Sequence, residues 1–99
     1  MYKVILLPPA KEDIKSASDW YNKQQKGLGK QFSISVRKTV KFIKNNPLAY
    51  RTRYGNTKTA IIERFPYMLH YSIDDDEKLI IISTILHTSR NPEKWINEI

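Results

Sequence analysis

Apolar residues in the first half of the chain recur at the spacing of amphipathic helices. One stripe, with spacings of four, three and four residues, consists of Ala10, Ile14, Ala17 and Tyr21. A second stripe, with spacings of four, four and three residues, consists of Phe32, Val36, Val40 and Ile43. Gly27-Leu28-Gly29 separates the two stripes, and Asn45-Asn46-Pro47 follows the second. These features predict a hairpin of two helices.

The residues before the first stripe predict a short strand that leads into a helix. Tyr2–Leu7 is mostly apolar and β-branched, and it ends at Pro8-Pro9. Pro9 suits the first helical turn, because a missing N–H group costs nothing there. Glu12 and Asp13 are expected in this first turn, where the positive end of the helix dipole favours a carboxylate.

The second half of the chain changes to the pattern of strands separated by turn residues. The expected strands are Tyr50–Tyr54, Thr59–Phe65, Tyr67–Ile73 and Lys78–His87. The acidic segment Asp74–Glu77 predicts a solvated hairpin turn. Its four consecutive acids lack the alternate spacing and the glycine of a calcium loop, so we expect no metal site. Pro92 is expected to begin one or two helical turns near the C-terminus.

This order of elements predicts a single domain of the α+β class over residues 1–99. It consists of an N-terminal strand, a two-helix hairpin and a four-stranded antiparallel meander, which form one twisted mixed sheet. Parallel neighbours in a sheet require a crossover connection, and the helical hairpin supplies one. The first strand is therefore expected to pair in parallel with a later strand.

Composition and charge narrow the class of protein further. The chain has no cysteine and no apolar run close to the roughly 20 residues of a membrane span, so we expect a cytoplasmic protein without a membrane partner. The net charge is +7, and all of this excess lies in residues 1–50. One face of the second expected helix is basic and carries Lys30, Arg37, Lys41 and Lys44. This face is either a solvated surface or a binding surface for an acidic partner or nucleic acid.

Several separated segments resemble the RelE/ParE family of toxins. In the first half the resemblance rests on Leu7–Ile14, on the pair Trp20-Tyr21 and on Gly27–Phe32. In the second half it rests on Asn46-Pro47, on Phe65-Pro66-Tyr67 running into Tyr71, and on His87–Pro92 ahead of Trp95. The segments occur in the family's order and span nearly the whole chain. The fold that the resemblance implies, a small twisted sheet packed on two helices, agrees with the order of elements above.

The resemblance implies the toxin of a bacterial type II toxin–antitoxin pair, with a cognate antitoxin protein as partner and no cofactor. One branch of the family cleaves mRNA on the ribosome, and the other binds DNA gyrase. The nuclease needs no metal: the 2′-OH of the RNA attacks the adjacent phosphate, so the protein supplies a base, an acid and cations. Both activities, and an inactive relative, stay open at this point, and we favour gyrase inhibition because the catalytic set is incomplete.

For a nuclease, the candidate catalytic residues are His87 and Arg90. For binding the antitoxin or the target, the candidates are Lys30, Arg37, Lys41, Lys44, Arg51, Arg53, Lys58 and Arg64. Lys58 stands where the family often has arginine, and it lacks the bidentate fork of a guanidinium. If residues 59–65 form a strand, Glu63 and Arg64 point to opposite faces of the sheet, which weakens the nuclease hypothesis.

Other conspicuous residues have structural interpretations as well. The ring of His87 is expected either to act chemically or to bond to nearby backbone at the end of the last strand. His70 is expected to be packed or solvated rather than reactive. Trp20 and Tyr21 are expected in the core of the hairpin, and Trp95 is expected to pack the C-terminal segment on the sheet.

Overall fold

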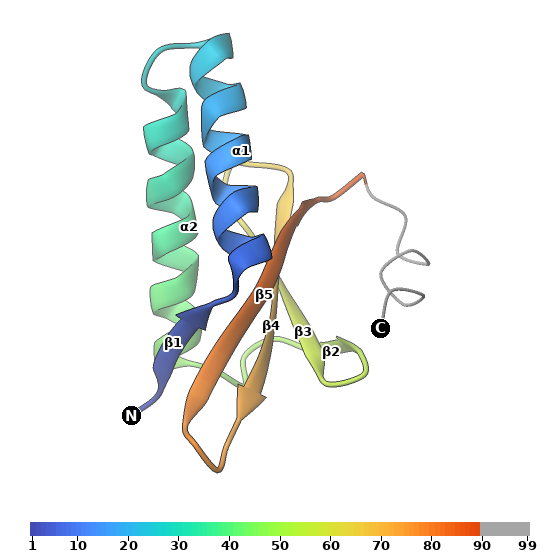
Figure 1. The fold of residues 1–99 in the computed structure, drawn as a ribbon. Helices are drawn as coiled ribbons and strands as arrows, with labels where there is room; N and C mark the ends of the chain where they lie inside the picture. The colour runs from blue at the N-terminus through green and yellow to red at the C-terminus, as the bar shows by residue number, and fades with distance from the viewer. Residues whose placement is uncertain (90–99) are drawn as a thin grey trace.

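The computed structural model describes residues 1–89, which form a mixed sheet with a helical hairpin on one side (Figure 1). The elements in chain order are β1 (Lys3–Leu6), α1 (Pro8–Gln24), α2 (Leu28–Asn45), β2 (Thr52–Tyr54), β3 (Thr57–Ile61), β4 (Tyr67–Asp74) and β5 (Leu79–His87). The five strands lie in the order β1-β5-β4-β3-β2. β1 pairs in parallel with β5, and all other pairs are antiparallel. The α+β fold and the parallel pairing predicted from the sequence are confirmed.

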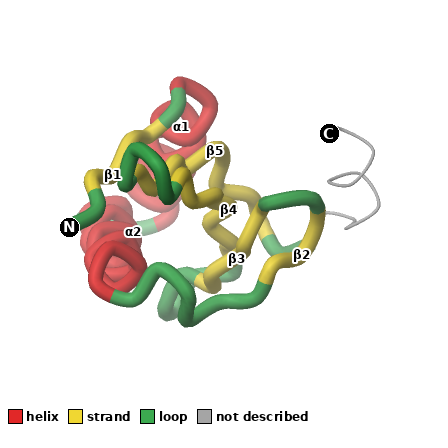
Figure 2. The backbone as a smooth tube through the Cα atoms, turned by 90° about the horizontal axis from the view of Figure 1, so that it is seen from below, coloured by secondary structure: helices red, strands yellow, loops and turns green. Residues whose placement is uncertain are grey.

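Both helices bury the apolar stripes that the sequence marks. Ala10, Ala17 and Tyr21 of α1 are buried, and so are Phe32, Val36 and Ile43 of α2. In Figure 2 the helices lie toward the β1 end of the sheet, and β2 is at the far edge. The longest strands, β4 and β5, lie in the middle and contribute Leu69, Tyr71, Ile80, Ile82 and Ile85 to the same core.

A close approach of the two helices occurs at Gly29. The Gly29 amide donates a 2.9 Å hydrogen bond to Oδ1 of Asn22 on α1. A Cβ atom at position 29 would lie 2.3 Å from the Ser18 carbonyl oxygen and 2.7 Å from the Asn22 side chain. Glycine is therefore required at this position for the helices to pack as closely as they do. One turn further along, the Ser18 and Ser33 hydroxyl oxygens lie 3.0 Å apart and continue the contact.

The expected strand over residues 59–65 is wrong at its C-terminal end. β3 ends at Ile61, and the next residues form a tight turn in which Arg64 has a φ of 72°. The Phe65 amide donates to the Ile62 carbonyl at 3.3 Å, and the Ile62 amide donates to the Tyr67 carbonyl at 2.9 Å. Side chains alternate between the two faces of a sheet only within a strand, so this rule does not apply to Glu63 and Arg64. The expectation that these two residues point to opposite faces of the sheet is therefore wrong.

Two expectations for α1 are also wrong. The helix begins at Pro8, so Glu12 and Asp13 lie beyond its first turn and do not act through the helix dipole. Trp20 is 55% exposed rather than part of the core, whereas its neighbour Tyr21 is buried as expected. Trp20 lies on the flank of the apolar stripe, so its ring is at the edge of the helix–sheet interface and not inside the core.

Some expectations concern residues outside residues 1–89: the C-terminal helical turns after Pro92, the packing of Trp95 and the position of Arg90. Within residues 1–89, no helix is long and apolar enough to cross a membrane. The same range contains no group of three or more histidine, aspartate or glutamate residues arranged to hold a metal ion.

The contact at Gly29 generates a stability prediction. Replacing Gly29→Ala forces the helices apart or displaces Asn22, because the added methyl group would overlap the Ser18 carbonyl. We expect the free energy of unfolding to fall by about 1–3 kcal/mol, the usual cost of overpacking. Urea denaturation followed by circular dichroism measures this change. Lys30→Ala, at the exposed neighbouring position, is the control and should change stability by less than about 0.5 kcal/mol; equal stability of both variants would contradict the prediction.

Candidate functional site

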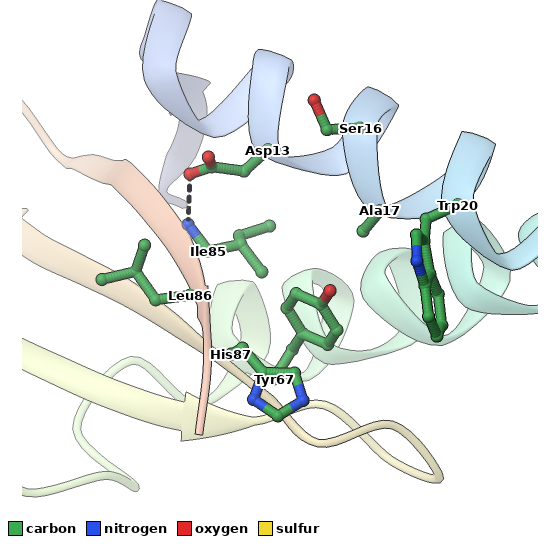
Figure 3. Close-up of a pocket in the computed structure, with 8 residues that line it drawn as sticks. All are labelled: Asp13, Ser16, Ala17, Trp20, Tyr67, Ile85, Leu86 and His87. Atoms are coloured by element: carbon green, nitrogen blue, oxygen red, sulfur yellow. Dashed lines mark hydrogen bonds between the residues drawn. The ribbon is translucent and has the colours of Figure 1, made fainter. Parts of the chain in front are cut away.

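The attachment of α1 to β5 defines one wall of the candidate site. β1 pairs with β5 only as far as Ile82, whose carbonyl accepts a 2.9 Å hydrogen bond from the Leu7 amide. Beyond that point the Asp13 carboxylate continues the pairing, because its Oδ2 atom accepts a hydrogen bond from the Ile85 amide at 2.9 Å (Figure 3). The same atom also accepts a hydrogen bond from the Thr84 hydroxyl. A side chain of α1 thus continues the edge pairing that β1 begins.

A groove lies beside this attachment, between α1 and the ends of β4 and β5. One hollow of about 290 Å³ is lined by Asp13, Ser16, Ala17, Trp20, Tyr67, Ile85, Leu86 and His87. A second hollow of about 360 Å³ is lined by Trp20, Tyr21, Pro66, Tyr67 and His87. The two share Trp20, Tyr67 and His87, so we call them together the aromatic groove. Figure 3 shows Trp20 on the helix side of the groove and the rings of Tyr67 and His87 on the sheet side.

The chemistry of the aromatic groove is that of a binding surface. Aromatic rings offer a large apolar contact area at a small cost in conformational entropy. The rings of Tyr67 and His87 meet edge to face, with centroids 5.2 Å apart. Asp13 supplies a carboxylate at one end, and among residues 1–89 no lysine or arginine lines either hollow. Such a groove suits an apolar or aromatic side chain of a protein partner better than a nucleic-acid backbone.

His87 is held by local backbone contacts. Its Nδ1 atom accepts a hydrogen bond from the Ser89 amide at 3.0 Å and lies 2.7 Å from the Ser89 hydroxyl. Because Nδ1 is the acceptor, the proton of the neutral ring is on Nε2. The sequence left open whether His87 acts chemically or bonds to nearby backbone. The observed geometry is that of a ring bonded to nearby backbone. The Nε2–H group remains a donor that a partner can use.

His70 is buried in the middle of the sheet, as one of the two sequence-based alternatives has it. Its side chain is 0% exposed, and its Nδ1 atom lies 2.8 Å from the hydroxyl of Tyr54 on β2. The pKa of His70 is lowered to about 4, first by burial and then by the charge of Arg53, while the charge of Asp13 acts in the opposite direction. The ring is therefore neutral at pH 7 and links the edge strand β2 to the centre of the sheet.

The candidate basic residues fall into two groups. The first is on α2, where Lys30, Arg37, Lys41 and Lys44 are all exposed. Arg64 belongs with this group, because its turn packs against α2 and it lines one hollow together with Lys38. Neither hollow of the aromatic groove includes any of these residues.

The second group consists of Arg51, just before β2, Arg53 on β2 and Lys58 on β3. Arg51 and Arg53 are exposed. The Lys58 ammonium donates to the Tyr50 carbonyl at 3.0 Å and to the Thr52 hydroxyl at 3.4 Å. Lys58 thus braces the short β2 segment against β3, and its charge is already engaged within the fold.

Sequence reasoning missed the role of Asp13 and the exposure of Trp20. A signal for both was present: Asp13, Ala17 and Trp20 follow one another at spacings of four and three, so they share one flank of α1. That flank faces β5. The apolar stripe marks only the centre of the helix face, so it does not separate this flank from the core.

Solved structures with the same fold are toxins of toxin–antitoxin systems. A chain from the chromosomal ParDE system of P. aeruginosa has a TM-score of 0.78 and 19% identity, with 90% of this chain and 98% of that chain covered. The isolated E. coli RelE toxin has a TM-score of 0.68 and 13% identity, with 99% of this chain and 98% of that chain covered. A chain from the RelBE2 toxin–antitoxin complex of Mycobacterium tuberculosis has a TM-score of 0.64 and 22% identity, with 87% of this chain and 96% of that chain covered.

The sequence itself settles the family. The family described as the ParE toxin of the type II toxin–antitoxin system parDE matches residues 4–92, which is most of the chain. No curated protein sequence matches significantly. The chain belongs to the ParE toxin family, and it is the toxin component of a type II toxin–antitoxin system. The family resemblance seen in the sequence is confirmed.

The buried His70 generates a pH prediction. Its folded-state pKa of about 4 lies below the ordinary value of 6.5, so between these values the unfolded chain binds more protons than the folded one. The stability due to the neutral ring is complete above pH 6.5 and is lost as the pH falls toward 4. We expect this loss to be on the order of 2 kcal/mol.

His70→Gln keeps a polar side chain near Tyr54 but cannot titrate in this range. Urea denaturation of both proteins at pH 7 and pH 4.5 measures the difference. The wild type should lose more stability than the variant over this interval, because the carboxylates titrate in both proteins and cancel. Equal losses in the two proteins would show that His70 is not buried in its neutral form.

Proposed function

We propose that this toxin inhibits DNA gyrase in the cytoplasm and is held inactive by a cognate antitoxin. The observation that carries the proposal is the aromatic groove: a preformed binding surface whose histidine is tied to the backbone of Ser89. A protein that blocks an enzyme needs a complementary surface and no tuned pKa. Trp20, exposed on α1 at the rim of this groove, is the expected anchor for the partner.

The positions of the other candidate residues support binding rather than RNA cleavage. Metal-independent cleavage relies on cooperating groups that each contribute about 10²–10⁴-fold. Within residues 1–89, Lys58 is engaged with Tyr50, His70 is fully buried, and Glu63 and Arg64 line a hollow against α2. These groups do not surround His87. Arg90, the other candidate for catalysis, lies outside the described residues.

The alternative function is a ribosome-dependent mRNA endonuclease, and one observation favours it. The Nε2–H group of His87 is a proton donor beside the ring of Tyr67, in a groove that reaches the surface. In this alternative His87 acts as the general acid for the leaving 5′-oxygen, and Arg90 stabilises the developing charge. The basic residues of α2 and β2 then contact ribosomal RNA.

The antitoxin is the partner proposed for the basic face of α2. Lys30, Arg37, Lys41 and Lys44 present four cations in one exposed row along that helix. An antitoxin segment rich in aspartate and glutamate would complement this row and speed association. Covering the helix also positions an antitoxin to reach over the hairpin toward the groove.

Two assays on the purified toxin separate the functions: supercoiling by gyrase with detection of trapped cleavage complexes, and mRNA cleavage on programmed ribosomes. We expect gyrase inhibition and no cleavage.

Trp20→Ala should raise the inhibitory concentration about tenfold, the usual effect of removing an aromatic anchor. His87→Ala should leave toxicity nearly unchanged, because the ring contributes contact but no chemistry.

Phe42→Ala is the matched control for Trp20→Ala. Phe42 is 48% exposed on α2, away from the lining of the aromatic groove, so its loss should leave gyrase inhibition unchanged. Codon-positioned mRNA cleavage by the wild type, abolished in His87→Ala, would overturn the proposal and establish the endonuclease.

A further inference from the structure

Arg64 adopts a backbone conformation that its side chain does not favour. Its φ of 72° lies in the left-handed region, where glycine and asparagine are at ease and other residues are strained. The turn is fixed around it by Ile62 and Phe65, which are both buried, and by the hydrogen bond from the Phe65 amide to the Ile62 carbonyl. Strained residues that the surrounding structure holds in place are concentrated at binding sites. The exposed guanidinium of Arg64 is a reason for keeping arginine at this position.

The turn packs on α2 and forms a hollow with it. This hollow, of about 190 Å³, is lined by Gln31, Ile34, Ser35, Lys38, Glu63 and Arg64. A second hollow of about 240 Å³ adjoins it on the helix and is lined by Ile34, Arg37, Lys38 and Lys41. Ile34 and Lys38 belong to both, so the two hollows form one continuous surface, which we call the Ile34 surface.

An apolar centre and a basic rim characterise the Ile34 surface. Ile34 is 39% exposed, an uncovered branched side chain between the two hollows. Its rim carries four cations, Arg37, Lys38, Lys41 and Arg64, and one acid, Glu63. The charge therefore selects a negatively charged partner.

The same lining decides between a nucleic acid and a peptide. Proteins that bind single-stranded nucleic acids combine cations with aromatic rings on which the bases stack. Of the residues that the structure describes, no aromatic one lines either hollow, and the middle of the surface is aliphatic. The exposed Ile34 side chain suits an aliphatic side chain of a partner, and the basic rim suits carboxylates on either side of it. An acidic amphipathic peptide has this pattern.

We propose that the Ile34 surface is a docking site for an acidic peptide segment, with one aliphatic side chain seated on Ile34 and carboxylates paired with Arg64 and Lys38. The inference rests on the proposed function in one respect: the antitoxin is the partner expected to supply this segment. It adds the turn after β3 to the basic face of α2 and explains why a strained arginine stands in that turn.

The test is a titration of the ¹⁵N-labelled toxin with a short synthetic peptide in which leucines one helical turn apart are flanked by glutamates. We expect amide shifts to centre on Ile34, Lys38 and Arg64. A twin peptide with glutamine in place of glutamate should not bind. Arg64→Gly should weaken binding about threefold, the upper range for one exposed ion pair, and Ile34→Gln combined with it about tenfold.

Lys78→Gly is the matched control. Lys78, in the turn before β5, is the other non-glycine residue with a positive φ, at 55°, within the described chain. Both glycine variants remove one positive charge and relieve the same kind of backbone strain, so both should keep or raise the melting temperature by a few degrees. Only Arg64→Gly should weaken binding of the peptide.

Three outcomes would overturn the inference: no shifts with the acidic peptide, shifts centred elsewhere, or equal weakening by Arg64→Gly and Lys78→Gly. Binding of single-stranded poly(dT) at Ile34 and Arg64, in place of the peptide, would assign the surface to nucleic acid instead. The titration contains neither gyrase nor ribosomes. Its failure therefore leaves the proposed inhibition of gyrase standing and counts against α2 as the antitoxin surface, whereas absence of gyrase inhibition leaves the docking site standing.

Discussion

The position of the helical hairpin depends on one hydrogen-bonded contact between α1 and β5. β1 is only four residues long and covers less than half of the edge of β5. Beyond the end of β1, the Asp13 carboxylate accepts hydrogen bonds from the Ile85 amide and from the Thr84 hydroxyl. A buried amide left without an acceptor costs about 1–3 kcal/mol. The carboxylate removes this cost and fixes α1 in register with the sheet, so that the aromatic groove opens beside it.

Two surfaces with different chemistry follow from this arrangement. The aromatic groove between α1 and β5 carries Trp20 and His87, and the described part of the chain contributes no lysine or arginine to its lining. The Ile34 surface, built on α2 and the turn after β3, is basic around an aliphatic centre. A toxin must contact a target and also be neutralised by an antitoxin. Separate surfaces let a small fold do both, with the first proposed for the target and the second for the antitoxin.

Periodicity predicted most of the fold, because burial of a helix face or a strand face depends on residues that are close in sequence. The buried positions Phe32 and Ile43 follow directly from it. Contacts between distant residues were not predictable in this way: Asp13 and Ile85 are 72 positions apart, and the spacing that places Asp13 on one flank of α1 does not identify its partner. The left-handed conformation of Arg64 was missed for a similar reason, since buried neighbours impose it against the preference of the residue. The sequence therefore named His87 and the basic residues as candidates, but it did not identify Asp13 or Trp20, and it did not group the residues into two surfaces.

Asp13 continues the sheet edge and so holds α1, and with it the aromatic groove, in a preformed arrangement against β5. Amide hydrogen exchange at Ile85 tests this claim most directly. We expect the Ile85 amide to exchange as slowly as that of Ile82, which lies within the part of β5 paired to β1. This protection should be lost in Asp13→Ala and kept in Asp19→Ala. Fast exchange of Ile85 in the wild-type protein, at the rate of an open strand edge, would contradict the account.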